Sequence, residues 1–139
     1  MNRVLLDTDV VLDFFLDRKP FAENTAVILS LCENKKINGF LTPVIIANLY
    51  YLLRKVSTHK RVIEKLKQLM NIVDVLSIDR QVIMMALNSN FKDFEDALQN
   101  YASELKNGID VIITGNVKDF QNSAIGILSP NEYLKINNL

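Results

Sequence analysis

The chain has 139 residues, and its 16 lysines and arginines are balanced by 16 aspartates and glutamates, so the formal net charge is zero. Bulk electrostatic attraction to nucleic acid or to an anionic membrane is therefore not expected. With 49% hydrophobic and 23% charged residues, three prolines and four glycines, the composition excludes disordered and collagen-like chains. One globular domain over residues 1–139 is expected.

The start of the chain favours a cytoplasmic protein, whereas its single cysteine does not mark the compartment strongly. The single cysteine, Cys32, cannot form an internal disulfide, and Asp7 arrives before any long apolar run, unlike in a secretory signal. The longest uncharged stretch, residues 37–53, contains several polar residues and is shorter than the ~20 apolar residues of a membrane-spanning helix. No membrane segment is expected.

Short apolar strands alternate with helices along the chain. Strands are predicted at Arg3 to Leu6, Gly39 to Leu41, Val73 to Leu76, Asp110 to Thr114 and Ile127 to Leu128. Helices are predicted at Asp9 to Leu16, Pro20 to Asn34, Val44 to Val56, Ser57 or Thr58 to Met70, Asp79 to Asn88, Phe94 to Lys106 and from Pro130 onward. Thr42 and Asp93 are expected to cap helices, and Asn107-Gly108 to end one.

This alternation predicts an α/β fold. Strands separated by helices pair in parallel through right-handed crossovers, which favours a three-layer α/β/α sandwich with a mainly parallel, about five-stranded sheet. In such folds the site lies beyond the carboxyl ends of the strands. Residues that follow a strand are therefore the first candidates for function.

Missing motifs exclude several classes of reaction. The four glycines are too dispersed for a dinucleotide fingerprint or a Walker loop. The only histidine, His59, lies among lysines and arginines, so a histidine-based zinc site is excluded and a nucleophilic triad would depend on His59 alone. Carboxylates are the plentiful reactive groups.

The first acidic cluster follows the first strand. Asp7 comes directly after the apolar residues 4–6, so the strand delivers it to the ligand edge of the sheet, and Thr8 and Asp9 share that turn. Asp9 is alternatively a helix cap that begins a solvated stripe of acids at positions 9, 13 and 17.

The second cluster opens a helix. Asp93 and Asp96 are three residues apart, so both face one side of its first turn, where the helix dipole favours negative charge. Capping alone explains Asp93 well. It explains Asp96 less well, because either acid would satisfy the first turn.

The third cluster leaves the fourth strand. Thr114, Asn116 and Asp119 form its exit loop at the ligand edge, where the alternative is a simple polar turn.

Together the three clusters bring Asp7, Asp96 and Asp119, with Asp93, to one rim. Crowded carboxylates repel one another unless a cation lies among them, and oxygen ligands select Mg²⁺ or Mn²⁺. Such an ion holds a phosphodiester and lowers the pKa of a bound water, so phosphoryl chemistry is predicted.

Asn48 is the only strongly polar side chain in the apolar helix residues 44–53. A buried amide needs partners. It therefore either holds neighbouring backbone groups or points into the acidic rim.

Several segments resemble, in order, the motifs of the PIN-domain family of VapC-like and PilT N-terminal-like ribonucleases. They are Val4 to Asp9, Asp93 to Leu98, Ile112 to Phe120 and the closing Leu128 to Leu134. The resemblance covers essentially the whole chain. It implies a parallel sheet flanked by helices, a homodimer, and Mg²⁺- or Mn²⁺-dependent cleavage of RNA, often by the toxin of a toxin–antitoxin pair.

The resemblance also implies roles for individual residues. It identifies Asp7, Asp96 and Asp119 as metal-binding acids and, with Asp93, as catalytic residues, supported by the polar side chains of Thr8, Asn48, Thr114 and Asn116. The family's usual glutamate in the apolar helix is replaced by Asn48. An amide oxygen can bind a metal but brings no charge, so either Asp93 compensates or the metal site is weaker.

Two other functions remain open. Residues 7–11 also fit the D-x-D-x-[TV] pattern of haloacid-dehalogenase-like phosphatases, in which Asp7 would be the nucleophile and Asp9 its acid/base partner. That interpretation leaves Asp93 and Asp96 without a role. The other alternative is a PIN-fold binding module whose catalytic site has decayed at Asn48.

The zero net charge hides an uneven distribution. Six lysines and arginines lie between residues 54 and 67 against one acid, Glu64. This stretch is either a solvated helix pair or an arm that follows phosphates. Its candidate substrate-binding residues are Arg54, Lys55, Lys60 and Arg61.

Overall fold

The protein, a computed structural model in which residues 2–105 and 108–138 are described, is built on one parallel sheet. Its strands are β1 (Arg3–Leu6), β2 (Asn38–Leu41), β3 (Asp74–Val75), β4 (Val111–Ile113) and β5 (Gly126–Leu128). Their order is β3-β2-β1-β4-β5, and every pairing is parallel. The α/β class and the five-stranded parallel sheet are thus confirmed.

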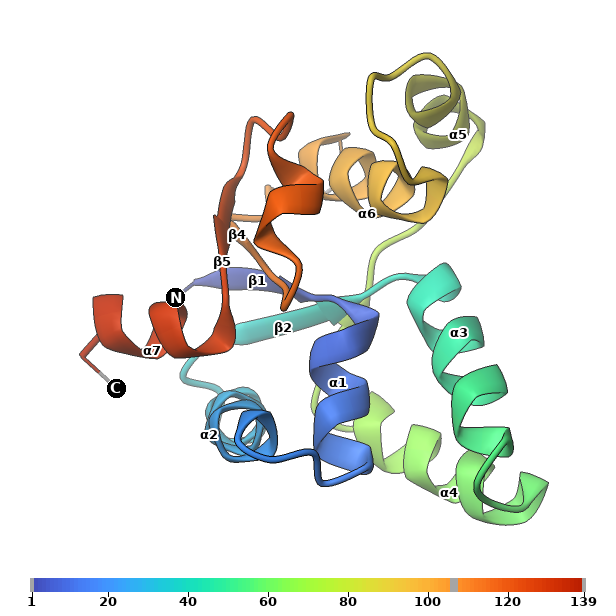
Figure 1. Ribbon diagram of the computed structural model, residues 1–139, viewed down its shortest axis with the longest axis vertical. Coiled ribbons are helices and arrows are strands. Elements are labelled where there is room, and N and C mark those ends of the chain that lie inside the picture. Colours follow the sequence, from blue (N-terminus) through green and yellow to red (C-terminus); the bar gives the residue numbers. More distant parts are fainter. Residues whose placement is uncertain (1, 106–107, 139) are drawn as a thin grey trace.

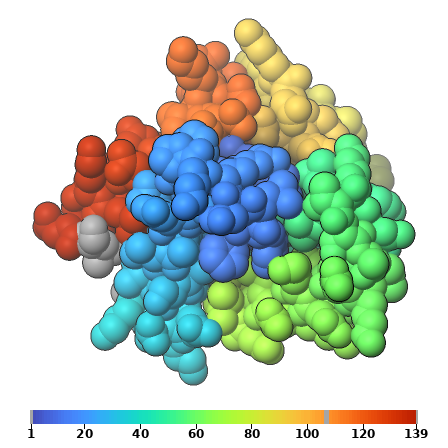
Figure 2. All heavy atoms as spheres, turned by 60° about the horizontal axis from the view of Figure 1, so that its bottom comes forward, coloured from blue at the N-terminus to red at the C-terminus, as the bar shows by residue number. Residues whose placement is uncertain are grey.

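The described part of the chain contains seven helices and a 3₁₀ turn, which connect the strands except for α7, which follows β5. They are α1 (Thr8–Phe15), α2 (Phe21–Glu33), α3 (Pro43–Arg54), α4 (His59–Met70), α5 (Arg80–Leu87), α6 (Phe94–Leu105), the 3₁₀ turn η1 (Val117–Phe120) and α7 (Pro130–Ile136). Figure 1 shows α5 and α6 on one side of the sheet and α1, α2, α4 and α7 on the other. Figure 2 shows the second of these layers, with α1 lying between α2 and the α3–α4 pair.

The helices begin where side-chain caps were predicted. The Thr42 hydroxyl accepts the backbone N–H of Ile45 at 3.2 Å at the start of α3, and the Thr58 hydroxyl accepts that of Arg61 at 3.3 Å at the start of α4. Of the two caps left open for α4, Thr58 is the one used.

Three local predictions need correction or fall outside the structure. Helix α1 starts at Thr8 with Asp7 as its cap, so the alternative role of Asp9 as a cap is wrong. Residues 117–120, expected as an irregular loop, form η1 because the backbone N–H of Asp119 bonds the Asn116 carbonyl at 3.0 Å. The predicted end of α6 at Lys106 and the Asn107 part of its stop lie outside the described residues.

The core explains why the chain places polar groups at one edge of the sheet. In β1 the side chains of Val4, Leu5 and Leu6 are fully buried, as expected for a central parallel strand covered on both faces. The chain runs from β1 to β2 on one side and later to β4 on the other, so the carboxyl ends of β1 and β4 form the topological switch point. None of the helices described is both long and apolar enough to cross a membrane.

Candidate active site

The Asp7 carboxylate is fixed where β1 and β4 end. Its backbone N–H donates to the Ile113 carbonyl at 3.0 Å, which continues the strand pairing. Its Oδ1 accepts the Thr8 N–H at 2.8 Å, and its Oδ2 accepts the hydroxyl of the fully buried Thr114 at 2.9 Å. Only 8% of Asp7 is exposed. Both oxygens are therefore oriented by donors from the protein.

Asp9 holds the loop that follows β4. Its Oδ2 accepts the Gly115 N–H at 3.0 Å and the Asn116 side-chain amide at 3.2 Å, and its buried Oδ1 has no partner among the described residues. A Cβ atom at Gly115 would collide with Asp9 Oδ2. Residue 115 must therefore lack a side chain for this carboxylate to reach the loop.

The second acidic cluster lies at the start of α6. Asp93 Oδ1 accepts the Asp96 backbone N–H at 3.0 Å, which confirms Asp93 as the cap of this helix. Asp96 is half-buried one turn further on. This leaves the Asp96 carboxylate available to the cavity beside it.

The clusters meet in one cavity of about 470 Å³, called here the acidic pocket. It is lined by Asp7, Thr8, Asp9, Leu12, Asn48, Tyr51, Leu52, Lys55, Asp93, Glu95, Asp96, Gln99, Asn116 and Asp119. The structure thus brings together the four predicted acids, Thr8, Asn48 and Asn116. Thr114 lies behind the wall, buried against Asp7.

Asn48 points into this pocket rather than toward backbone groups. Its side-chain amide donates to Glu95 Oε2 at 2.8 Å. Sequence reasoning missed Glu95, although it lies between Asp93 and Asp96. It also missed Gln99, which is 1% exposed and accepts the Thr42 hydroxyl. Gln99 follows Asp96 by three residues, so helical spacing was the signal that placed it on the same face.

The crowding of carboxylates raises three pKa values. Burial raises the pKa of Asp7, against the hydrogen bonds from Thr114 and Thr8. Burial and then the charge of Asp7 raise the pKa of Asp9 to about 6. Burial, followed by the charges of Asp7, Asp93, Asp119 and Glu95, raises the pKa of Asp96 to about 7. The pocket therefore carries more negative charge than its own donors compensate.

This donor set fits a hard divalent cation. All its ligating atoms are oxygens, which Mg²⁺ and Mn²⁺ prefer. Within residues 2–105 and 108–138, no three acidic, histidine or cysteine side chains converge closely enough to enclose an ion by themselves. Mg²⁺ commonly binds through one or two carboxylates and keeps several waters, so an open arrangement suits it.

The four predicted basic residues divide between two places. Lys55 lines the acidic pocket, and Arg54 lines a shallow neighbouring hollow with Lys55, Tyr50 and Tyr51. Arg54 also donates to the Ser57 carbonyl at 3.0 Å. Lys60 and Arg61 are exposed on the first turn of α4 and line neither cavity, so the structure does not bring them to the site.

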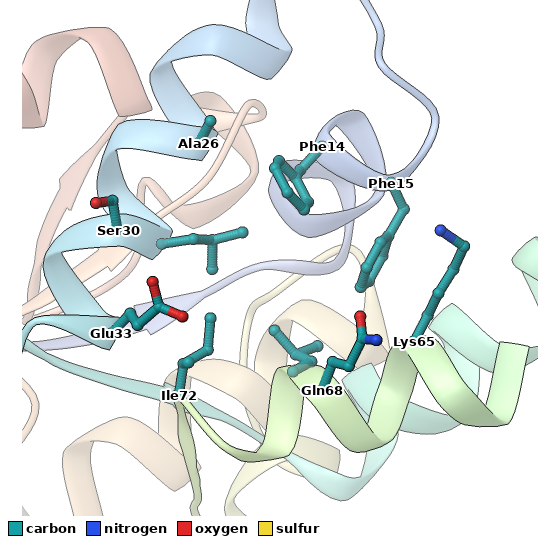
Figure 3. A pocket seen from close by; sticks show the side chains of 10 residues that line it. Phe14, Phe15, Ala26, Ser30, Glu33, Lys65, Gln68 and Ile72 are labelled. Atoms are coloured by element: carbon teal, nitrogen blue, oxygen red, sulfur yellow. The ribbon is translucent and has the colours of Figure 1, made fainter.

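A second cavity of about 290 Å³ lies apart from the acids, between α1, α2 and α4. Figure 3 shows Phe14 and Phe15 on one side of it and Ile72 and Gln68 on the other, with Glu33 and Lys65 at opposite ends. Apolar side chains form much of its wall. It contains none of the acids of the acidic pocket and is not a candidate for phosphoryl chemistry.

Comparison with known proteins identifies the family. A family model described as "PIN domain" matches residues 3–118. The chain belongs to the PIN-domain family. The matched segment contains Asp7, Asp93 and Asp96 and ends one residue before Asp119.

Relatives agree with this assignment over most of the chain. It is similar to "Ribonuclease VapC1" of Aquifex aeolicus, with 26% identity over 95% of this chain and 93% of that protein. It shares its fold with DNA-bound VapBC from Salmonella typhimurium (TM-score 0.69, 18% identity, 94% of this chain and 99% of that one). It also resembles Mycobacterium tuberculosis VapC20, described as a sarcin-ricin loop cleaving toxin (TM-score 0.61, 14% identity, covering 78% of this chain and 86% of that one).

Membership of this family gives no support to the haloacid-dehalogenase alternative. In that interpretation Asp9 acts on a phosphate beside Asp7. In the structure Asp9 Oδ2 is instead occupied by Gly115 and Asn116 of the exit loop.

Proposed function

We propose that the chain is a Mg²⁺- or Mn²⁺-dependent endoribonuclease whose catalytic residues are Asp7, Asp93, Asp96 and Asp119. The observation that carries the proposal is the meeting of these carboxylates, from three distant segments, in one pocket with surplus negative charge. The similarity to a protein named a ribonuclease, and to one that cleaves the sarcin-ricin loop, supports RNA as the substrate.

In this proposal Asp7, Asp96 and Asp119 hold the ion, and the other residues position them. When bound, the ion would neutralise charge on a phosphodiester and acidify a water. Thr114 and the Thr8 N–H orient Asp7, and Asp93 fixes the first turn that carries Asp96. Asn48 orients Glu95, which supplies a carboxylate where the family resemblance leads one to expect a glutamate.

Cleavage of mixed single-stranded RNAs in Mn²⁺ tests the function. We expect Asp7→Asn and Asp96→Asn each to lower the cleavage rate more than about a hundredfold, because each removes a charge that the cation needs. Asp17→Asn is the matched control, since Asp17 is exposed and has the left-handed backbone (φ 50°) that asparagine tolerates.

Cleavage that survives both substitutions and chelation of the metal would overturn the proposal. The remaining alternative, a non-catalytic binding module, predicts a different result. In that case the wild-type protein would bind RNA without shortening it, and Asp96→Asn would change neither property.

We also propose that the chain is a toxin with an antitoxin partner and that it forms a homodimer. Structures that share its fold include one described as a toxin–antitoxin complex from Klebsiella pneumoniae. Expression of the wild type is expected to arrest growth of a bacterial host, and Asp7→Asn to relieve the arrest. Light scattering of the purified chain measures the dimer directly, and a monomeric mass would contradict it.

A further inference from the structure

The acidic pocket is the middle of a longer trough. It shares Tyr51 and Lys55 with the shallow hollow formed by Tyr50, Tyr51, Arg54 and Lys55 at the end of α3, called here the aromatic hollow. On α6 and η1 it shares Asp93 and Asp119 with a cavity of about 440 Å³, the lysine hollow, which is also lined by Lys92, Lys118, Gln121 and Asn122. The three hollows form one continuous surface path.

Tyr51 presents an exposed aromatic ring to this path. It is 68% exposed, and its ring packs edge-on against Tyr50, with ring centres 5.3 Å apart and an interplanar angle of 81°. The Tyr50 hydroxyl is hydrogen-bonded to His59 Nδ1 at 2.8 Å, and the two rings also touch edge-on. Tyr50 is therefore held between α3 and α4. It braces Tyr51 without covering it.

Positive charges lie at both ends of the trough and negative charges in its middle. Arg54 and Lys55 are exposed at one end, and Lys92 and Lys118 at the other. The carboxylates between them repel a phosphate unless a cation is bound. A polyanion is therefore attracted at two separated places, while its central phosphate depends on the metal.

The type of side chain at each position selects the kind of polyanion. An exposed ring beside cationic side chains, here Arg54 and Lys55, is an arrangement that binds unpaired bases, because a base stacks on the ring while its phosphate contacts the cation. In a duplex the bases are stacked on each other and are not available to Tyr51. The trough thus favours a single strand.

We propose, on the basis of the ribonuclease function proposed above, that single-stranded RNA lies along this trough. One unpaired base stacks on Tyr51 with its phosphate near Lys55 and Arg54. The strand crosses the acidic pocket, and two phosphates beyond the cleaved bond contact Lys92 and Lys118, one each. Tyr51 is then a residue that selects unpaired over paired RNA at the site.

Binding of a fluorescently labelled, unstructured ten-nucleotide RNA tests this placement, with Asp7→Asn as the background so that the RNA stays intact. Adding Tyr51→Ala is expected to weaken binding at least about five- to tenfold, the lower end of the range for loss of one exposed base stack. Tyr51→Phe keeps the ring and should stay within about twofold. A fully paired RNA duplex of the same length should bind more weakly and should not respond to Tyr51→Ala.

Salt dependence tests the lysine hollow separately. If Lys92 and Lys118 each contact a phosphate, the double variant Lys92→Gln/Lys118→Gln should reduce the slope of log Kd against log salt by about 1.4, since each contact with a single strand contributes about 0.7. The matched control is Lys36→Gln/Lys135→Gln. Both control lysines are exposed and lie outside the trough, and the slope should not change.

The two proposals fail in different ways. If the wild type cleaves RNA in an Asp96-dependent manner but neither Tyr51→Ala nor the lysine pair alters binding, the RNA path is wrong and the nuclease function stands. If Tyr51→Ala leaves RNA affinity unchanged and instead shifts the oligomeric state, Tyr51 belongs to a protein interface and the path is overturned. If the wild type neither binds nor cleaves RNA, both proposals fall.

Discussion

The acidic pocket has two walls, one at the ends of β1 and β4 and one at the start of α6, and their carboxylates differ in how they are hydrogen-bonded. On the β1–β4 wall, the carboxylates of Asp7 and Asp9 together accept four hydrogen bonds, one each from Thr8, Thr114, Gly115 and Asn116. On the α6 wall, no hydrogen bond to the Asp96 carboxylate is found in the part of the chain that is described. The first wall holds its carboxylates in place with the chain's own donors, although burial still raises the pKa of Asp7 and Asp9. The second leaves its charge for a ligand.

This contrast separates stability from function. Substitutions on the β1–β4 wall should unfold the protein more easily, because they break contacts that orient a buried carboxylate. Substitution of Asp96 on the α6 wall should relieve repulsion and cost only activity.

The largest effect on stability is expected for Thr114→Val. The change removes the donor to Asp7 Oδ2 and the acceptor of the Asn116 N–H at 3.0 Å, while keeping the shape of the side chain. We expect a loss of about 2 to 3 kcal/mol in the free energy of unfolding, measured by urea denaturation. The matched control is Thr25→Val, since Thr25 is also fully buried but its hydroxyl donates only to the Phe21 carbonyl within α2.

Thr25→Val should change the stability by less than about 0.5 kcal/mol. Equal effects of the two substitutions would show that the hydrogen bond to Asp7 is not what holds this wall.

A smaller loss is expected for Gly115→Ala, because the added methyl group collides with the Asp9 carboxylate. We expect about 1 to 2 kcal/mol of destabilisation from displacing either the loop or the carboxylate. A double-mutant cycle with Asp9→Ala isolates the cause. If the clash is responsible, Gly115→Ala should cost almost nothing in the Asp9→Ala background, whereas an undiminished cost would place the strain elsewhere.

The α6 wall should respond in the opposite direction. The folded state raises the pKa of Asp96 to about 7 from an ordinary value of 3.8. Between about pH 4 and pH 7 the folded protein therefore keeps a proton on Asp96 that the unfolded chain has already lost. Stability without divalent metal should therefore fall as pH rises through this window. Asp96→Asn should reduce this decrease of stability with pH. At pH 8 the variant should be about 1 kcal/mol more stable than the wild type, once solvent screening is allowed for.

Thermal or urea unfolding between pH 4 and pH 8 measures this difference, with Asp17→Asn as the control. An Asp96→Asn protein that is less stable than the wild type at pH 8 would mean that Asp96 stabilises the fold. The contrast between the two walls would then be wrong.

Much of the site could be predicted from the sequence because its parts follow regular elements. Asp7 comes after a buried strand, and Asp93 and Asp96 share one helical turn, so parallel topology alone brings them to one edge. The role of Asp9 could not be predicted, since its partners Gly115 and Asn116 are more than a hundred residues away. The pairing of Asn48 with Glu95 likewise depends on how α3 and α6 are placed in space.

The substrate-binding candidates show the same limit. Sequence proximity grouped Lys60 and Arg61 with Lys55, but they lie on the next helix, α4, and do not line the pocket. Lys92 and Lys118, which lie far apart in the chain, are brought together beside Asp93 and Asp119. The cytoplasmic location and the single domain over residues 1–139 remain predictions.

Calorimetric titration of Mn²⁺ into the metal-free protein at pH 7 tests the central claim most directly. We expect wild-type binding to release protons, seen by comparing buffers of different ionisation enthalpy, because burial and the neighbouring carboxylates raise the pKa of Asp96 to about 7. Asp96→Asn should bind at least about tenfold more weakly and release fewer protons. Equal affinities and equal proton release for the two proteins would contradict a metal site at this pocket.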